Sequence, residues 1–191
     1  FLAGCQTAFG WFLNVYIEIF RGTPMIVQSM VIFYGSAQAF NISLDRTWAA
    51  IFIVSINTGA YMSEIVRGGI FSSGFSQFEA ATALGMTHGQ TMRKVVLPQV
   101  VRNILPATGN EFVINIKDTS VLNVISVVEL YFTGNTVATQ NYQYFPTFTI
   151  IAVIYFVLTF TITRILRYIE RRLDSDTYTT GANQMQVNEV K

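Results

Sequence analysis

Charged residues are scarce in this 191-residue chain. Asp, Glu, Lys and Arg together make up 12% of the residues, whereas a soluble domain typically carries about 25%. Apolar residues make up 51%. A soluble protein of this length would need more charge to cover its surface. The composition therefore predicts a membrane protein, with lipid around much of the chain.

Cysteine and histidine are nearly absent, with one of each, Cys5 and His88. A single cysteine excludes an intrachain disulfide and a cysteine metal cluster, and a single histidine excludes a multi-histidine metal site. The sequence also lacks a Gly-x-x-x-x-Gly-Lys-Ser/Thr loop, the motif that holds ATP phosphates. We therefore expect no metal, no cofactor and no catalytic residues in this chain.

Four apolar segments are long enough to cross a bilayer, for which about 20 residues are needed. They lie at about residues 20–40, 47–66, 104–132 and 146–166, and polar residues interrupt the third. Residues 1–19 are also apolar, which fits an interfacial helix or the end of a further spanning helix. The predicted fold is an all-α, polytopic membrane helical bundle formed by residues 1–173.

The basic residues indicate how these segments are oriented, because Lys and Arg of short loops stay on the cytoplasmic side. They flank or occupy the stretch at 68–103 and follow the last apolar segment (Arg67, Arg93, Lys94, Arg102; Arg164, Arg167, Arg171, Arg172). We therefore expect residues 68–103 to be a cytoplasmic loop and the C-terminus to be cytoplasmic. Residues 174–191 are polar and aperiodic, which predicts a disordered tail.

The predicted cytoplasmic loop contains two signals for the start of a helix. Ser76 with Glu79, and Thr87 with Gln90, have the spacing of a capping box, in which two side chains satisfy each other's backbone N–H groups. Gly85 is expected just after the end of the first helix. The pattern predicts two short helices, and neither is long enough to be stable without a partner.

The same loop contains a longer motif, made of Glu79-Ala80-Ala81, Gly85, Val95 and Leu97-Pro98. It resembles the EAA loop of the permeases of ATP-binding-cassette (ABC) importers, with Val95 where Ile is usual. The resemblance implies a coupling helix that docks on an ATPase (Glu79, Ala80, Ala81, Gly85, Leu97, Pro98). An ordinary helical hairpin is the less favoured alternative. Pro98 is expected to interrupt or bend the second helix.

Motifs elsewhere narrow the resemblance to the polar amino acid permeases of the histidine/glutamine/glutamate type. They are Tyr16-Ile17-Glu18, Arg21-Gly22-Thr23-Pro24, the run from Asn57 to Glu64, Gly109-Asn110 and Lys117-Asp118-Thr119-Ser120. The likeness covers about residues 16–173. It implies a type I importer permease in the bacterial plasma (inner) membrane, which gives a polar amino acid alternating access to the two sides.

The resemblance also implies partners. These are ATPase subunits that carry ATP-Mg, a second permease chain, identical or different, an extracytoplasmic solute-binding protein and membrane lipid, but no nucleic acid. An importer permease of this class for another solute, such as methionine or a metal ion, stays open. An ion-coupled secondary transporter is less favoured, because it would have broken helices in both halves, and only one interrupted segment is found.

Polar and small residues in the segment at 47–66 fall on two sides of a helix that turns about 100° per residue. Small residues on one side would let another helix approach closely (Ser55, Gly59, Ser63). The opposite side is polar (Asn57, Tyr61, Glu64). Asn57 and Tyr61 are candidates for the substrate pathway, and an interhelical hydrogen bond is an equal alternative for Asn57.

The segment at 104–132 carries ionisable residues at a depth where charge is costly, which makes them functional candidates. Glu111, Asn115 and Asp118 share one helix face, and Asp118 lies about 20 Å along the helix from Ile104. We predict that Asp118 binds the α-ammonium or a cationic side chain of the substrate, together with Glu111 and Asn115. Lys117 is the candidate for the α-carboxylate, and a structural ion pair between Lys117 and Asp118 is the alternative.

Overall fold

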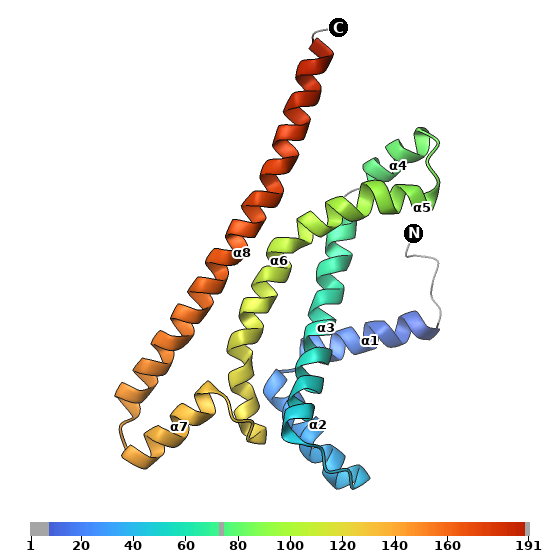
Figure 1. Ribbon diagram of the computed structural model, residues 1–191. Coiled ribbons are helices and arrows are strands. Elements are labelled where there is room, and N and C mark those ends of the chain that lie inside the picture. The colour runs from blue at the N-terminus through green and yellow to red at the C-terminus, as the bar shows by residue number, and fades with distance from the viewer. Residues whose placement is uncertain (1–7, 73–74, 190–191) are drawn as a thin grey trace. The chain divides into compact units, whose positions relative to one another are not determined.

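The computed structural model describes the backbone of residues 8–72 and 75–189 and the side chains of residues 10–72 and 77–172. Within these ranges every regular element is a helix (Figure 1), as predicted. The chain forms two compact units. The first contains the residues up to Glu64 together with Glu111–Thr159, and the second contains Ile65–Asn110 together with the residues from Phe160 on.

The α-helices in chain order are α1 (Ala8–Gly22), α2 (Met25–Phe40), α3 (Arg46–Ser72), α4 (Phe75–Ala83), α5 (His88–Thr91), α6 (Leu97–Asp118), α7 (Leu130–Asn141) and α8 (Tyr144–Glu189). A π-helix, Met92–Val96, connects α5 to α6, and a 3-10 helix, Thr119–Ile125, continues α6.

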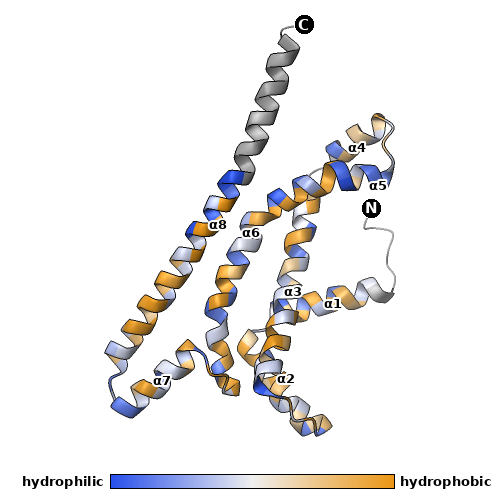
Figure 2. Cartoon of the chain, viewed as in Figure 1, coloured by the Kyte–Doolittle hydropathy of each residue, from blue (hydrophilic) through white to orange (hydrophobic). Residues whose placement is uncertain are grey.

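Two of the described helices are long and apolar enough to cross a bilayer. They are α3, with 27 residues, and the part of α8 from Tyr144 to Arg172, with a mean hydropathy of 2.1. Figure 2 shows the hydrophobic residues along this part of α8. The stretch His88–Ile125 and α7, bent by 54° at the break between them, add a third span if they are counted together. By length and composition, the part of the chain that the structure describes therefore contains two candidate spans, or three with the bent pair, where four were predicted.

The predicted span at about 20–40 is wrong in its bounds, because the chain breaks at Pro24. Helix α1 ends at Gly22, and α2 begins at Met25 with only 16 residues. Pro24 is the N-cap of α2, with extended backbone at φ −64° and ψ 137°. Proline has no N–H and disfavours helical backbone in the preceding residue, so one helix cannot continue through it.

The last helix also differs from the prediction, because α8 continues to Glu189 where a disordered tail was expected from residue 174. No proline follows Pro146. Each residue added to an existing helix gains a backbone hydrogen bond without a new nucleation step, so a long helix tends to propagate.

The buried core of the first unit holds α3 against the 3-10 helix that follows Asp118. Its members come from these two elements (Ala49, Ala50, Ile53, Leu122, Ile125). Partly buried side chains of α2 pack around them (Met25, Ile32, Phe33). The positions of the core residues on α3 follow the helical period, so one face of α3 is used for this packing.

Glycines allow two close approaches within the second unit. A Cβ atom on Gly69 of α3 would lie 2.1 Å from Cγ2 of Ile104 on α6. A Cβ atom on Gly109 of α6 would lie 3.3 Å from Cδ1 of Leu166 on α8. Small residues at such points let apolar helices pack by van der Waals contact, which is a main source of helix association in lipid.

Candidate functional site

The corner between α1 and α2 is stabilised by one buried amide, that of Gln28, which is 6% exposed. Its Nε2 donates to the carbonyl of Phe20 at 2.9 Å, and to the carbonyl and hydroxyl of Thr23 at 2.9 and 2.8 Å. Carbonyls at the end of a helix lack intrahelical partners. An unsatisfied backbone group away from water is costly, so Gln28 replaces the hydrogen bonds that the break at Pro24 removes.

Asn57 on α3 is bound to this corner. Its side chain is 7% exposed. Its Nδ2 donates to Oε1 of Gln28 at 2.9 Å and to the carbonyl of Phe20 at 3.4 Å. Of the two roles considered for Asn57, the interhelical hydrogen bond is the one present in the structure. The importance of Gln28 was missed, although an amide in an apolar segment already signals that a polar partner must exist.

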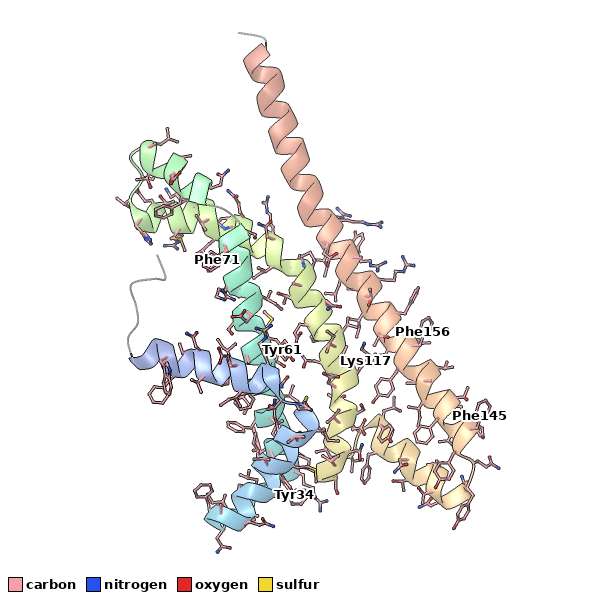
Figure 3. The ribbon with its side chains drawn as sticks, turned by 180° about the vertical axis from the view of Figure 1, so that it is seen from behind. Tyr34, Tyr61, Phe71, Lys117, Phe145 and Phe156 are labelled. Carbon is pink, nitrogen blue, oxygen red and sulfur yellow. The ribbon has the colours of Figure 1, made fainter. Side chains whose placement is uncertain are left out.

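Tyr61 and Glu64, on the same side of α3, meet Arg21 of α1. Nη1 of Arg21 lies 3.2 Å from Oε2 of Glu64. The guanidinium carbon of Arg21 lies 5.7 Å from the centre of the Tyr61 ring, which Figure 3 labels on α3. The side chain of Arg21 is 42% exposed, in contrast to the buried amides of Gln28 and Asn57.

Tyr16 adds a third contact between α1 and α3. Its hydroxyl donates to the carbonyl of Ile56. A Cβ atom on Gly59 would lie 3.1 Å from that hydroxyl oxygen. A close helix was predicted at the stripe that includes Gly59, and the group that the structure places beside Gly59 is the side chain of Tyr16.

The predicted polar strip on α6, formed by Glu111, Asn115 and Asp118, lies in the first unit. Glu111 is 8% exposed, while Asn115 and Asp118 are half-buried. Oδ1 of Asn115 accepts a hydrogen bond from the hydroxyl of Thr58 on α3 at 3.0 Å. The strip is thus joined to α3 through Thr58, next in sequence to Asn57.

Lys117 differs from the strip, since its side chain is exposed (Figure 3). No ion pair between Lys117 and Asp118 occurs among the described side chains. The α-helix ends at Asp118, where the backbone tightens into the 3-10 helix. A 3-10 stretch inside a long helix often marks a hinge.

Glu129 is a further polar residue that sequence reasoning missed. Its two carboxylate oxygens accept from the backbone N–H groups of Tyr131 and Phe132 at 2.7 and 2.5 Å, which caps α7. The hydroxyl of Tyr155 on α8 donates to the same carboxylate at 3.1 Å. A lone acidic residue just before an apolar run was the available signal, because negative groups favour helix N-termini.

The loop with the EAA-like motif, in the second unit, has the predicted turn. Gly85 has φ +79°. Its N–H donates to the carbonyl of Thr82 at 2.9 Å, and the N–H of Met86 donates to that of Ala81 at 3.1 Å, which together form a Schellman motif. Gly85 is therefore confirmed as the residue that ends α4.

The second predicted capping box is also confirmed. The N–H of Gln90 donates to the Thr87 hydroxyl at 3.4 Å, and that of Thr87 donates to Oε1 of Gln90 at 3.0 Å. The rings of Phe78 and His88 meet edge to face, 5.2 Å between centres. Helix α4 begins at Phe75, so Ser76 lies in its first turn, and the Ser76 side chain is outside the described residues.

The other residues of the motif are partly exposed. Glu79 and Ala80 are exposed, whereas Ala81 is buried. The helix continues through Leu97 and Pro98 after the π-helix, in which the N–H of Leu97 donates to the carbonyl of Met92. The helix is therefore not interrupted at Pro98. It widens into a π-helix over the five residues before Leu97, and this accommodates a residue that lacks an N–H.

Comparison with known proteins identifies the chain. A family described as "Binding-protein-dependent transport system inner membrane component" matches residues 2–175. The chain belongs to this family. It is thus a multi-pass membrane protein, and its membership confirms the predicted class of ABC importer permeases.

Relatives of the permease include proteins named as permeases of amino acid transport systems. It is 40% identical over 178 residues to the glutamine transport system permease protein GlnP of Escherichia coli K12, covering 90% of this chain and 81% of that protein. It is 36% identical over 168 residues to the arginine transport system permease protein ArtQ of Bacillus subtilis, with coverages of 88% and 77%. The L-cystine permease TcyB of B. subtilis is 40% identical over 165 residues, with coverages of 86% and 70%.

Solved structures agree on the fold. The permease superposes on a crystal structure of an amino acid ABC transporter with histidines with a TM-score of 0.79 and 42% identity, covering 83% of this chain and 74% of that one. An inward-facing structure of the MetNI methionine ABC transporter gives a TM-score of 0.71 at 19% identity, covering 84% and 73%, and so supports the fold alone.

Proposed function

We propose that this permease is the membrane subunit of an ATP-driven importer and that it gives a polar amino acid alternating access across the membrane. The observation that carries the proposal is the strip of Glu111, Asn115 and Asp118 on one face of α6, joined to α3 by the hydrogen bond between Thr58 and Asn115. Carboxylates at membrane depth attract a cationic group, and every amino acid carries an α-ammonium.

The named cargoes of the relatives support a polar amino acid rather than a metal ion or an ion-coupled mechanism, because glutamine, arginine and cystine are all polar amino acids. In this proposal Asp118 binds the cationic group, with Glu111 and Asn115 beside it. Lys117 stays a candidate for the α-carboxylate. Asn57 and Tyr61 of α3 contact the corner between α1 and α2. In this proposal they hold α3 in place beside the site and do not bind the substrate themselves.

The proposed partners follow from the same function. ATPase subunits would carry ATP-Mg and dock on the coupling loop, where Glu79 and Ala80 are exposed and Leu84 is 83% exposed. A second permease chain would complete the pathway, and an extracytoplasmic binding protein would deliver the amino acid in the plasma membrane of a bacterium.

The proposed orientation places the coupling loop and the C-terminus in the cytoplasm, supported by the arginines that follow the apolar segments. In a variant without Cys5, a cysteine at Lys94 should react only with a reagent on the cytoplasmic side, and one at Ser43 only from outside. Both positions are exposed. Reaction of both from one side would contradict this orientation.

The substitution Asp118→Asn tests the site, because it keeps the shape of the side chain and removes its charge. We expect the variant to assemble with its ATPase and keep basal hydrolysis, but to lose at least about tenfold in uptake of L-glutamine or L-arginine by proteoliposomes, the loss of one charge-assisted contact. Asp45→Asn is the matched control, since exposed Asp45 caps α3 and asparagine caps equally well.

Two results would count against the assignment. Normal uptake by Asp118→Asn would show that the strip does not bind the substrate, and failed assembly would show that Asp118 is structural. Lack of uptake of any polar amino acid by the unmodified transporter would contradict the proposed function itself.

A further inference from the structure

Positive charge is concentrated at the end of the described side chains of α8. The helix is uncharged from Tyr144 to Thr163 and then carries four arginines and one acidic residue, Glu170, up to Arg172. About 20 uncharged residues at about 1.5 Å each cover about 30 Å, the thickness of the hydrocarbon core of a bilayer. The first arginine, Arg164, therefore lies where the hydrocarbon ends and the lipid phosphates begin (Figure 2).

Three of these arginines lie on one narrow face of the helix. Leu166 marks the side of α8 that meets α6, since a Cβ atom on Gly109 would lie 3.3 Å from its Cδ1. Counted around the axis from Leu166 at about 100° per residue, the three arginines lie between about 100° and 160° (Arg164, Arg167, Arg171). All three are exposed. This group, the arginine face, is therefore turned away from α6.

The described contacts of the arginine face leave its N–H donors available. The ring of Phe160, itself 48% exposed, lies 4.9 Å from the guanidinium carbon of Arg164. A cation–π contact uses the plane of a guanidinium, and its five N–H groups point outward from the edge. Neither a hydrogen bond nor an ion pair of the other two arginines occurs among the described residues. Arg172 is not part of the face, since it donates to the hydroxyl of Tyr168 at 3.0 and 2.7 Å.

The spacing of the face suits phosphate oxygens. Arg167 is about 4.5 Å along the helix axis from Arg164 and about 6 Å from Arg171, so neighbouring side chains can reach one phosphate. Guanidinium forks bind phosphate oxygens in pairs. At this depth the anions that a membrane supplies are the phosphates of lipid headgroups. A zwitterionic lipid also brings an ammonium, which the positive face repels, so a headgroup with net negative charge is favoured.

We propose that Arg164, Arg167 and Arg171 form a binding site for an anionic phospholipid. Its phosphate lies among the three guanidinium groups, and its acyl chains lie along α8 on the side of Phe160. The occupant is a lipid because the charge follows directly on an apolar segment of mean hydropathy 2.1. A lipid matches both parts, whereas a soluble partner matches the charge alone. The proposal goes beyond the proposed function, since it holds whichever solute is carried.

The test measures lipid binding to the transporter, purified with its ATPase in a neutral detergent. Phosphatidylglycerol is titrated, and native mass spectrometry gives its Kd from the lipid-bound fraction. Phosphatidylcholine with the same acyl chains is the comparison without net charge. Each basic residue near an anionic lipid contributes about fivefold, so we expect phosphatidylglycerol to bind about 100-fold more tightly. Salt should reduce this preference, because exposed charges are screened.

Glutamine substitutions test the three arginines. The triple variant Arg164→Gln, Arg167→Gln and Arg171→Gln should lower the preference for phosphatidylglycerol to less than about threefold, with little change for phosphatidylcholine. The matched control is Arg93→Gln with Lys94→Gln, which removes two exposed basic residues near the coupling loop. This control should keep the full preference. A full preference in the triple variant would overturn the proposal.

An exchange variant separates the arginine face from the overall charge. Arg164→Ile with Ile165→Arg, and Arg167→Ile with Ile169→Arg, keep the composition and the net charge but turn the two arginines by about 100° and 200° around the helix. Both isoleucines are exposed, by 54% and 42%. We expect this variant to lose most of the preference. A full preference would show diffuse attraction to net charge and would exclude a site. If the variant fails to co-purify with its ATPase, the triple glutamine variant decides.

Two further measurements identify the occupant. A photoreactive benzoylphenylalanine in place of Phe160 should crosslink to phospholipid in membranes, and crosslinking to a second permease chain or to another protein would overturn the proposal. Glycerophosphoglycerol, the headgroup without acyl chains, should not compete with phosphatidylglycerol. Equal competition would show a site for a soluble phosphodiester instead of a lipid. Equal binding of the two lipids by the unmodified transporter would refute the site and leave the proposed function intact.

Discussion

Two of the corners between helices, the one between α4 and α5 and the one between α1 and α2, are built in different ways. The corner between α4 and α5 is closed by bonds among neighbours in sequence: Gly85 to Thr82, Met86 to Ala81, and Thr87 with Gln90. The corner between α1 and α2 is closed by Gln28, whose amide oxygen accepts from Asn57, 29 residues away on α3. The first corner depends on its own sequence, and the second depends on another helix.

This difference bears on function. A corner that is closed locally can present the same surface to a partner whatever the rest of the chain does, which suits a coupling loop. A corner that is tied to α3 cannot move without breaking hydrogen bonds to α3. Any change in the position of α3 therefore affects the corner between α1 and α2 through Asn57.

The largest expected effect is at Gln28. Gln28→Leu removes the donor to the carbonyls of Phe20 and Thr23 and the acceptor for the amide of Asn57, which keeps only its longer bond to the Phe20 carbonyl. A buried polar group left without its partner costs about 1–3 kcal/mol. We expect a clear fall in the thermal unfolding midpoint of the purified permease. The exposed Gln140 of α7 provides the control, Gln140→Leu.

A double variant sharpens this test. If Gln28 and Asn57 act as a pair, Gln28→Leu with Asn57→Leu should destabilise by less than the sum of the single changes, because the second change removes a group that the first had left unsatisfied. Strict additivity would show that the two amides do not depend on each other.

A smaller effect is expected at Gly85. Substitution by alanine should lower the stability of the fold at Gly85 and raise it at the nearby Gly89. Gly85 has φ +79°, so Gly85→Ala should cost about 1 kcal/mol or more and weaken binding of the ATPase. Gly89 lies in α5 without positive φ and without neighbours within 4 Å of a Cβ. Gly89→Ala should stabilise slightly, since alanine favours a helix. Equal effects, measured by co-purification of the ATPase and by unfolding, would contradict the turn.

The smallest effect is expected at Thr87. Thr87→Ala removes the hydroxyl that accepts from Gln90, at a cost of about 1 kcal/mol, whereas Thr87→Ser keeps it. We expect hydrogen exchange in α5 to increase in the alanine variant alone. The corner between α1 and α2 should be unaffected, and increased exchange there would show that the two corners are not independent.

Features that depend on neighbours in sequence could be predicted, whereas features that depend on another helix could not. Gly85 and the box of Thr87 and Gln90 were found because each depends on residues within a few positions, where spacing determines the hydrogen bonds. The shared face of Glu111, Asn115 and Asp118 was found because α6 is regular there and the helical period is constant.

The partners of Gln28, Arg21 and Glu129 could not be found in this way. Their contacts lie on Asn57, Glu64 and Tyr155, and no local period relates positions so far apart. The break at Pro24 was present in the sequence, but the apolar character of the surrounding segment outweighed it in the prediction of a single span.

The sequence by itself determined that this chain is an α-helical membrane protein, where the turn at Gly85 lies and which polar residues share the face of α6. These are consequences of composition and of short-range geometry. The tertiary structure alone decided which polar groups bind the protein itself and which remain within reach of a ligand. The physical reason is that a buried donor or acceptor must find a partner, and whether that partner is protein or substrate depends on which helices meet.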